Sequence, residues 1–492
     1  MKFILNIRLI MHIYGIIALC IGAAMIPAIA TAFIYKETAA GYAFLTTCLV
    51  LFIAGLFCTF FIKPKKHTMK TRDGFFIVGF GWLLAALIGC IPYLASGYTD
   101  SFCSAFFESA AGFTTTGATV FDLESTPHAF LMWKAVSHWI GGMGIIVFTV
   151  SLLPTLGAGG YKIFKAEVPV LTTDRIVSRI SDSARILYSI YIGFTILQFL
   201  LLSLSSSMNI FDAIICTLGC MSTSGLSSHA AGIAFFNSVY VEIVVSVFTI
   251  LASVNFSMYI MAAKGNLKEI RKNTELRTFL AILLISTVLT ALSLYRSGTF
   301  PTISQSLRNA FFQVTSFSST TGYSAASYSD WPAFCLLLFF LLMLIGGCSG
   351  STCGSLKIIR PIVLFKLVIR SIYRRIHPRA VVAVKVGSQP ISADVASQIT
   401  SFILAFLAIL LSGTLLISLQ GFDFVTNIST SLSMLSNTGL AFGQAGIGGD
   451  FSPFADPIRL VLAILMIIGR LEIFTFLILL TPSFWHPDKA VD

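Results

Sequence analysis

The chain has 492 residues, of which 56% are hydrophobic and only 11% charged, whereas an ordinary soluble domain carries about 25% charged residues. These values exclude a soluble globular protein and favour an all-α polytopic membrane protein. The net charge of +11 is typical of positive loops that face the cytoplasm and lipid headgroups; it does not indicate a nucleic-acid partner, because no basic stretch is interleaved with aromatic residues on a polar domain.

Apolar runs of about 20 residues predict ten membrane-spanning helices. The first run ends in AIATA and imitates a secretory signal, but the apolar stretch from Leu9 to Phe33 is too long for a signal core of about 7–15 residues. The eighth is too long for one straight span, so two half-helices around the glycine-rich segment 346–355 are expected. The expected spans are 9–34, 41–62, 74–97, 132–153, 186–205, 235–262, 276–295, 332–372, 396–418 and 458–481.

The basic residues are distributed unevenly over the connections between these spans. Of the 32 Lys and Arg residues, 25 lie before the first span, follow spans two, four or six, or follow the break in the eighth. Short cytoplasmic loops collect Lys and Arg, so both termini are expected in the cytoplasm. The opposite loops carry acidic residues such as Asp212 and Asp450, which would make the outer face attractive to cations.

Four of the outward connections contain a short Ser/Thr-rich string that ends in glycine. The glycines are 108, 97 and 117 residues apart, which indicates a repeated unit of helix, re-entrant segment and helix. All four strings fall on one side, so the repeats are expected to be parallel, unlike the inverted repeats of many secondary transporters. String one is Thr114, Thr115, Thr116 and Gly117; string two is Ser222, Thr223, Ser224 and Gly225; string three is Ser319, Thr320, Thr321 and Gly322; string four is Ser436, Asn437, Thr438 and Gly439.

A short apolar segment precedes each string. Thirteen residues before the glycines stand Ser104, Asp212, Asn309 and Thr426, which are expected to cap the N-termini of four half-helices. Any single string is ordinary loop composition, but four in register predict a pore. Non-helical backbone at membrane depth is tolerated where it lines a water-filled cavity, and rings of carbonyl and hydroxyl oxygens replace the hydration shell of a monovalent cation.

Several longer motifs carry a resemblance to a known family. They are FESAAGFTTTGATVF at 107–121, SHWIGGMGIIVF at 137–148, SSTTGYS at 318–324, GGCSGSTCGSLKIIR at 346–360 and GRLEIFTF at 469–476. These strings resemble the TrkH/TrkG membrane subunits of the Trk/Ktr/HKT potassium transporter superfamily over essentially the whole chain. Two extra N-terminal helices precede the four repeats, as in TrkH and unlike the shorter KtrB pattern.

The resemblance implies a potassium-conducting homodimer in the bacterial inner membrane, controlled by a cytosolic TrkA-type regulator whose RCK domains bind NAD or ATP/ADP. It assigns potassium binding to all sixteen string residues, and the four intact glycines favour potassium over sodium. The chain needs no cofactor of its own; potassium is the substrate. The sequence departs from the family pattern in two places. Asn437 replaces the hydroxyl residue of the other three strings, and Cys353 and Ser355 leave loop 346–355 with fewer glycines than is usual in the family.

Loop 346–355 is expected to form a movable gate beneath the strings, as the resemblance implies; a structural kink is the alternative. It is not a phosphate-binding loop, because Lys357 follows Leu356 rather than the Gly-Lys-[Ser/Thr] order. Arg470 lies deep in the last span and is expected to face the conduction path or the carbonyls of this loop. The gate residues are Gly346, Gly347, Gly350, Ser351, Thr352, Gly354 and Arg470.

The expected organisation is 1–70 for two N-terminal helices, then repeats at 71–175, 176–272, 273–385 and 386–492. An alternating-access symporter for a small solute is the alternative function, although it calls for two inverted halves. A membrane-embedded enzyme is disfavoured, since His138, Arg470 and Glu472 do not make a catalytic set. His138, Lys134 and Glu242 are expected to be packing or interfacial residues.

Overall fold

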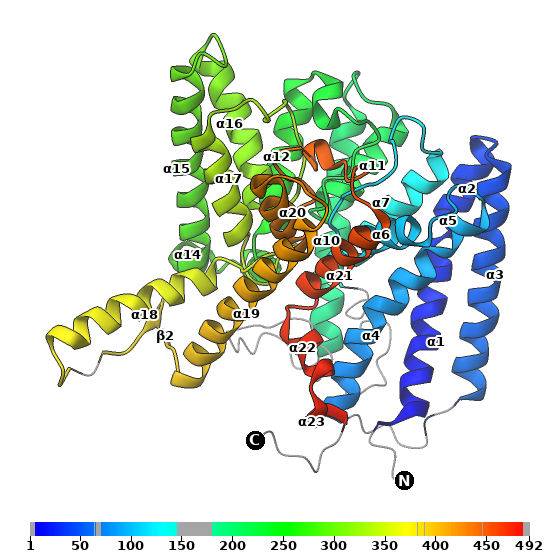
Figure 1. Ribbon diagram of the computed structural model, residues 1–492, viewed down its shortest axis with the longest axis horizontal. Coiled ribbons are helices and arrows are strands. Elements are labelled where there is room, and N and C mark those ends of the chain that lie inside the picture. The colour runs from blue at the N-terminus through cyan, green and yellow to red at the C-terminus, as the bar shows by residue number, and fades with distance from the viewer. Residues whose placement is uncertain are drawn as a thin grey trace.

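The computed structural model describes residues 5–62, 64, 70–144, 180–380, 382–387, 389–444 and 446–485 (Figure 1). The expected fourth span and the basic connection after it run into 145–179, outside the described residues. Apart from one two-stranded antiparallel hairpin and an isolated parallel bridge between Thr119 and Asp450, the described secondary structure is helical. The N-terminal half contains α1 (Ile7–Ala24), α2 (Ile26–Ile34), α3 (Thr38–Phe61), α4 (Thr71–Gly89), α5 (Ile91–Ala95), α6 (Phe102–Phe113), α7 (His128–Gly142), α10 (Ile180–Ser203), α11 (Ile210–Met221), η2 (Gly232–Phe236), α12 (Val239–Ser253) and α13 (Phe256–Ala263).

The C-terminal half continues the same alternation of long and short helices. It contains α14 (Leu267–Lys272), α15 (Thr274–Arg296), α16 (Ile303–Ser318), α17 (Ala333–Ile345), α18 (Ile359–Ile376), β1 (Lys385–Val386), β2 (Gln389–Pro390), α19 (Ala393–Ser418), α20 (Phe424–Ser436), η3 (Ile447–Gly449), α21 (Asp456–Arg470), α22 (Phe474–Leu480) and α23 (Pro482–Trp485).

Within the described ranges, six helical segments are long and apolar enough to cross a membrane, and eight if two bent pairs each count as one span. Two further expected spans are represented by shorter helices. The fourth begins in α7, whose continuation is not described, and the eighth contains the 13-residue apolar helix α17. The structure therefore has the apolar helices of a multi-pass membrane protein.

Three helices break at the level of loop 346–355. The break between α17 and α18 was expected from the glycines there. Two others were not: α12 and α13 meet at 92°, and α21 and α22 meet at 114°. The expected sixth and tenth spans are therefore bent rather than straight. The sequence did not predict these bends because the residues at the two breaks, 254–255 and 471–473, include no glycine or proline.

The N-terminal helices are fastened to the first repeat by a carboxylate. Glu37, between α2 and α3, accepts hydrogen bonds from the backbone N–H groups of His128 at 2.7 Å and Ala129 at 2.9 Å. These N–H groups belong to the first turn of α7, which has no side-chain cap of its own. Glu37 thus satisfies free donors at a helix N-terminus from a distant part of the chain.

Four short helices, α6, α11, α16 and α20, each run into a string. Their N-caps are Ser101, Asn209, Thr302 and Asp423, so the expected caps Ser104, Asp212, Asn309 and Thr426 are wrong. In three of the four helices, the expected residue is instead the one whose backbone N–H donates to the true cap, as Ser104 does to Ser101 at 3.2 Å. A cap bonds the N–H three residues on, and Asn309 lies still deeper, inside α16.

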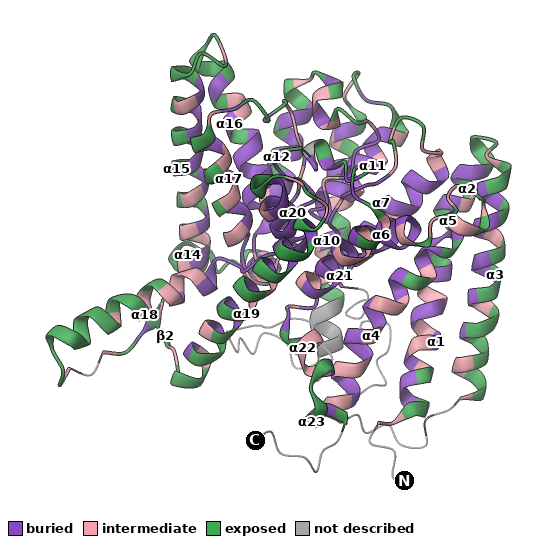
Figure 2. Cartoon of the chain, viewed as in Figure 1, coloured by how far each residue is buried: buried purple, intermediate pink, exposed green. Residues whose placement is uncertain are grey.

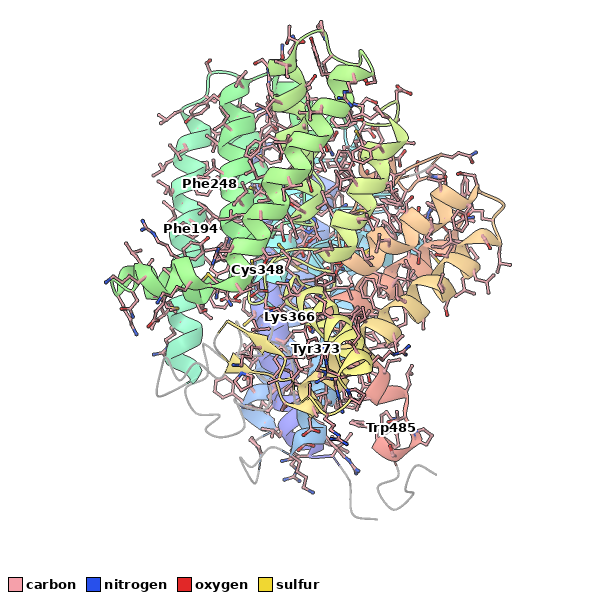
Figure 3. All side chains as sticks on the ribbon, turned by 90° about the vertical axis from the view of Figure 1, so that its left-hand side faces the viewer. Phe194, Phe248, Cys348, Lys366, Tyr373 and Trp485 are labelled. Carbon is pink, nitrogen blue, oxygen red and sulfur yellow. The ribbon has the colours of Figure 1, made fainter. Side chains whose placement is uncertain are left out.

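Burial separates the centre of the molecule from its rim (Figure 2). The strings and the helices that carry them are buried, whereas α3 and α15 expose rows of apolar side chains such as Phe60 and Leu284. Long helices also pack through aromatic contacts, as between Phe194 of α10 and Phe248 of α12, whose ring centroids lie 6.5 Å apart (Figure 3). A buried polar centre inside an apolar, exposed rim is the arrangement of a membrane protein with a polar core.

Candidate functional site

The four strings share one backbone conformation. The second residue of each has a left-handed backbone, with φ of 59° at Thr115, 53° at Thr223 and Thr320, and 56° at Asn437. The terminal glycines also have positive φ, between 68° and 83°. Threonine is β-branched and rarely adopts this region, so its occurrence at three equivalent positions marks a strained and repeated geometry.

The strings form a closed ring in chain order. A Cβ added to Gly117 would overlap the carbonyl oxygen of Ser224 in string two. The same construction takes Gly225 to Thr321, Gly322 to Thr438 and Gly439 back to Thr116. Each glycine therefore lies against the third carbonyl of the next string, and the fourth string returns to the first. This closed cycle of contacts places the four strings around a common axis.

Hydroxyl pairs hold each string in shape. The first and third hydroxyls of a string lie within hydrogen-bond distance of each other: 2.8 Å between Thr114 and Thr116, 3.2 Å in string two and 2.7 Å in strings three and four. The first hydroxyl also donates back into its helix, as Thr114 does to the carbonyl of Ala110 at 2.7 Å. Because these hydroxyls are engaged within the string, the main-chain carbonyls remain as the groups available to an ion.

Those carbonyls are not used elsewhere. No described residue donates a hydrogen bond to the third-residue carbonyls of Thr116, Ser224, Thr321 and Thr438. Each string also follows directly from the C-terminal end of a short helix, which carries the negative end of its dipole. The ring therefore combines unpaired carbonyl oxygens with four negative helix ends, a combination that favours a cation without any carboxylate at its centre.

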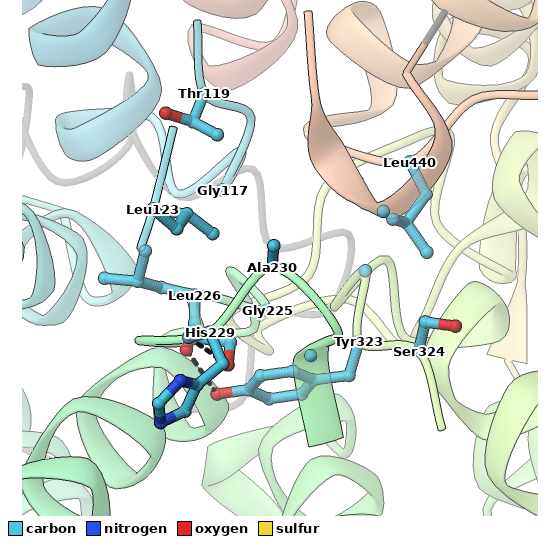
Figure 4. A pocket seen from close by; sticks show the side chains of 14 residues that line it. Gly117, Thr119, Leu123, Gly225, Leu226, His229, Ala230, Tyr323, Ser324 and Leu440 are labelled. Carbon is cyan, nitrogen blue, oxygen red and sulfur yellow. Dashed lines mark hydrogen bonds between the residues drawn. The ribbon is translucent and has the colours of Figure 1, made fainter. Parts of the chain in front are cut away.

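A small cavity opens on one side of the ring (Figure 4). Gly117, Gly225 and Gly322 lie at its wall, together with Leu440, which follows the fourth glycine. His229 stands at its edge, 3.5 Å from Asp212 through Nε2 and 3.5 Å from Glu124 through Nδ1. The cavity thus leads directly to the strings past a rim that carries acidic side chains.

The departure at Asn437 has a structural explanation. Asparagine adopts the left-handed backbone more readily than threonine. Its Nδ2 donates to the hydroxyl of Thr116 at 3.1 Å and to the carbonyl of Met466 at 2.9 Å, so it joins string four to string one and to α21. Asn437 supports the closure of the ring through its side chain.

Loop 346–355 lies against the face of the strings opposite the cavity. The Gly354 N–H donates to the hydroxyl of Thr320 at 2.9 Å, and a Cβ at Gly354 would overlap the carbonyl of Ser436. Gly346 and Gly350 have φ of 72° and 70°, and a Cβ at Gly347 would crowd Cys353. The loop therefore passes directly under strings three and four, where the glycines allow its turns.

The loop fills the break between α12 and α13. Cys348 N–H donates to Ser253 at 3.0 Å and Thr352 N–H to Ala252 at 3.3 Å, while Phe256 N–H donates to Gly350 at 3.0 Å. Within the loop, the Ser351 hydroxyl donates to the Cys348 carbonyl at 2.5 Å. Carbonyls freed by the broken helix thus find partners in the loop, which is how non-helical backbone is satisfied at membrane depth.

Arg470 joins the loop to two other helices. It donates to the carbonyl of Thr352 at 3.0 Å and to that of Gly142, at the end of α7, at 2.9 Å. Glu472 turns away from it and pairs with Arg360. Arg470 therefore contacts the carbonyls of the loop, one of the two environments expected for it.

Comparison with known proteins agrees with this geometry. The model of the TrkH family, described as a cation transport protein, matches residues 40–487. This chain belongs to the TrkH family. The potassium transporter TrkH of Vibrio parahaemolyticus has a crystal structure that superposes with a TM-score of 0.87, at 34% identity, covering 99% of this chain and 100% of that one. The Trk system potassium uptake proteins TrkH and TrkG of Escherichia coli are each 32% identical over 98% of this chain, covering 100% and 99% of their own lengths.

Sequence reasoning about this TrkH-family chain missed two carboxylates, Glu108 and Glu275, and the partner of a third, Glu242. Glu108 pairs with Lys134, Glu242 pairs with Arg308 at 2.6 Å, and Glu275 accepts from the Ser349 N–H at 2.6 Å. Lys134 and Glu242, expected to be packing or interfacial, are thus members of ion pairs, while His138 is fully buried. The one available signal was the presence of acidic residues inside apolar segments, where charge is expensive unless paired.

Proposed function

We propose that this chain takes up potassium through a channel-like pore across the bacterial inner membrane. The observation that carries the proposal is the closed ring of glycines and carbonyls, since it gathers four strings around one axis. Rings of main-chain carbonyls select monovalent cations by replacing their hydration shell. The potassium uptake proteins to which the chain is similar point to the same ion.

The architecture that serves this function has ten spans arranged as two N-terminal helices and four parallel repeats. The repeats occupy 71–175, 176–272, 273–385 and 386–492, after an N-terminal pair at 1–70. Its support is the common sequence of short helix, string and second helix in each repeat. With both termini in the cytoplasm, the cavity beside His229 is the outer mouth and loop 346–355 lies on the cytoplasmic side of the filter.

Loop 346–355 and Arg470 act as the gate. Two contacts support this role: the loop touches two strings from below, and Arg470 bonds it to the end of α7. A guanidinium beneath a cation filter opposes passage, and a loop that must move to open the path needs glycines at its turns.

Control by a cytosolic nucleotide-binding regulator of the TrkA type, and assembly as a homodimer, complete the proposal. The Trk system names of the relatives support a multi-component transporter. The chain offers a basic docking surface on α18, which carries Arg370, Arg374 and Arg375 in the same part of the helix as exposed Tyr373. Figure 3 shows Lys366 and Tyr373 of this helix.

An alternating-access symporter is the competing function. It calls for broken helices at corresponding positions of two inverted halves. The breaks after α12, α17 and α21 instead follow strings two, three and four in the same order along the chain. A parallel series of breaks below a closed ring favours a gated pore.

Ion-substituted flux through liposomes that hold the purified chain alone tests the proposal. We expect passive potassium flux that exceeds sodium flux and needs no second solute. Equal flux of the two ions would contradict a potassium filter. Potassium movement that stops when protons, sodium or a small solute is withdrawn would instead favour the symporter.

A further inference from the structure

A buried ion pair lies behind string one. Glu108 of α6 and Lys134 of α7 are only 2% and 3% exposed, and Lys134 Nζ lies 2.5 Å from Glu108 Oε2. An unpaired charge in such a place costs several kcal/mol, so a buried pair persists where other hydrogen bonds also satisfy it. The remaining bonds of this pair all lead to one segment, residues 118–120, which directly follows Gly117.

The contacts of the pair fix the main chain of that segment. Lys134 Nζ donates to the Ala118 carbonyl at 2.8 Å. Glu108 Oε1 accepts from the Val120 N–H at 2.6 Å and from the Thr119 hydroxyl at 2.7 Å. Every contact is to the three residues that follow string one. The N–H of the Ala118–Thr119 peptide donates to the Gly449 carbonyl at 2.9 Å, so Lys134 and Gly449 together orient this peptide.

The other strings secure the same carbonyl by different means. After Gly225, the Leu226 carbonyl accepts from the Tyr323 hydroxyl at 3.0 Å (Figure 4). After Gly322, the Tyr323 carbonyl accepts from Ser316 at 2.6 Å and from Gln313 at 3.5 Å. No described residue donates to the Leu440 carbonyl after Gly439.

Strings one and three differ in the group that holds the carbonyl after the glycine. Glu108 and Gln313 both stand nine residues before their string's glycine, so the two side chains occupy equivalent places. In repeat three a neutral amide supplies the donor directly. In repeat one a carboxylate stands there, and a lysine from the next helix supplies the donor. Among the described residues, the carbonyl after Gly117 is the one of the four that accepts from a charged group, so its orientation is sensitive to the balance of charge between Glu108 and Lys134.

We propose that Glu108 and Lys134 are a positioning pair that orients the Ala118 carbonyl, directly after string one, and thereby sets the potassium preference of the filter. The inference rests on the proposed function, because it assigns these residues to the filter of that same pore. Neither residue needs to touch the ion. Glu108 neutralises a lysine that would otherwise repel a cation in the pore, and Lys134 directs the Ala118 carbonyl.

The test measures potassium-to-sodium permeability ratios in liposomes for Glu108→Gln, Lys134→Met and the double variant. Each single change should lower the ratio by about tenfold, since a buried hydrogen bond left unmade near the filter is a perturbation of that order. The double variant places glutamine where repeat three has Gln313 and removes the lone lysine. It should therefore recover part of the loss rather than multiply the two defects.

Glu242→Gln and Arg308→Met provide the matched control, because that pair joins α12 to α16 away from the strings. Its loss should leave the ratio unchanged. If a single variant is not recovered as monodisperse protein, Thr119→Val removes one bond to Glu108 without changing side-chain shape, and it should lower the ratio by a smaller factor.

Three results would overturn the inference. They are an unchanged ratio in monodisperse Glu108→Gln or Lys134→Met, multiplicative defects in the double variant, or an unchanged ratio in Thr119→Val. In each case a selective parent protein would leave the proposed potassium pore intact. A parent protein without potassium preference would instead overturn the proposed function itself, and the positioning role with it.

Discussion

The backbone N–H of Gly354 donates to the hydroxyl of Thr320 at 2.9 Å. This bond joins loop 346–355 to string three, although the two segments lie on opposite sides of α17 in the sequence. The loop is therefore hydrogen-bonded to the strings on the side opposite the cavity. A movement of the loop would shift strings three and four, because Gly354 bonds Thr320 and lies against the carbonyl of Ser436.

Thr320→Val should raise potassium flux. The substitution keeps the side-chain shape but removes the acceptor of Gly354, and the loss of this half-buried hydrogen bond costs about 1 kcal/mol, which loosens the loop. A shift of about 1 kcal/mol corresponds to about a fivefold change in the open population. Flux through liposomes measures the change. The control is Thr223→Val, because the hydroxyl of Thr223 donates to the carbonyl of its neighbour Ser222 and not to the loop. Equal flux in both variants would show that the bond between Thr320 and Gly354 does not restrain the gate.

Gly117→Ser should lower the potassium-to-sodium ratio by about tenfold. The added Cβ would overlap the Ser224 carbonyl, and a non-glycine residue at positive φ costs about 1–2 kcal/mol. Gly97→Ser is the matched control, because Gly97 has φ of 71° but no atom near its Cβ position. Gly97→Ser therefore has the same free-energy cost of a positive φ, but at a position outside the ring of strings. A ratio that stays at the parent's value in Gly117→Ser would show that string one does not line the filter.

Deleting several residues of loop 346–355, or replacing Arg470 with Ala, should raise potassium flux. The deletion removes the constriction, and Arg470→Ala removes both a positive charge and the bond to Thr352. Arg459→Ala is the control on the same helix, because Arg459 bonds Asp456 and Ser104 at the far end of α21. The variants must be monodisperse with unchanged ion preference. Flux no greater than the parent's in both would place the restriction elsewhere.

Glu275→Ala should raise the basal potassium flux of the chain alone. Glu275 begins α15 and holds the loop through the Ser349 N–H at 2.6 Å, so its removal frees one anchor of the gate. The neighbouring helix α14 is basic and exposed, so Glu275 lies between an exposed basic helix and the loop. Exposed Glu269 on α14 supplies the control, since Glu269→Ala should leave basal flux unchanged. No difference between the two variants would remove Glu275 from the gate.

Neutralising Arg370, Arg374, Arg375 and Arg379 together should weaken binding of a TrkA-type regulator. Charge-steered association falls with ionic strength, so the parent complex should lose affinity as salt is raised and the variant should lose much less. Titration of the purified regulator at low and high salt measures both effects. Unchanged affinity and unchanged salt dependence in the variant would show that α18 does not steer the partner.

The apolar helices and the four strings were predictable because their signals are local. A run of apolar residues is long enough to cross a bilayer or it is not, and a glycine at positive φ can be inferred from a repeated Ser/Thr-Gly pattern. The caps were misplaced by three residues or more because Ser, Asn and Asp recur near the start of each short helix. The exact cap depends on which side chain meets a free N–H, and this is settled only when the helix forms.

The sequence by itself determined the membrane class, the charge asymmetry and the four equivalent strings, since each depends on composition or spacing within one segment. Only the tertiary structure decided the ring closure, the breaks at α12/α13 and α21/α22, and the partners of Glu108 and Glu275. Those features depend on contacts between different segments, which are 26 residues apart for Glu108 and Lys134, 74 for Glu275 and Ser349, and 321 for Asn437 and Thr116. A buried charge signals that some partner exists, but which atoms surround it is a property of packing, and packing brings together what the chain order separates.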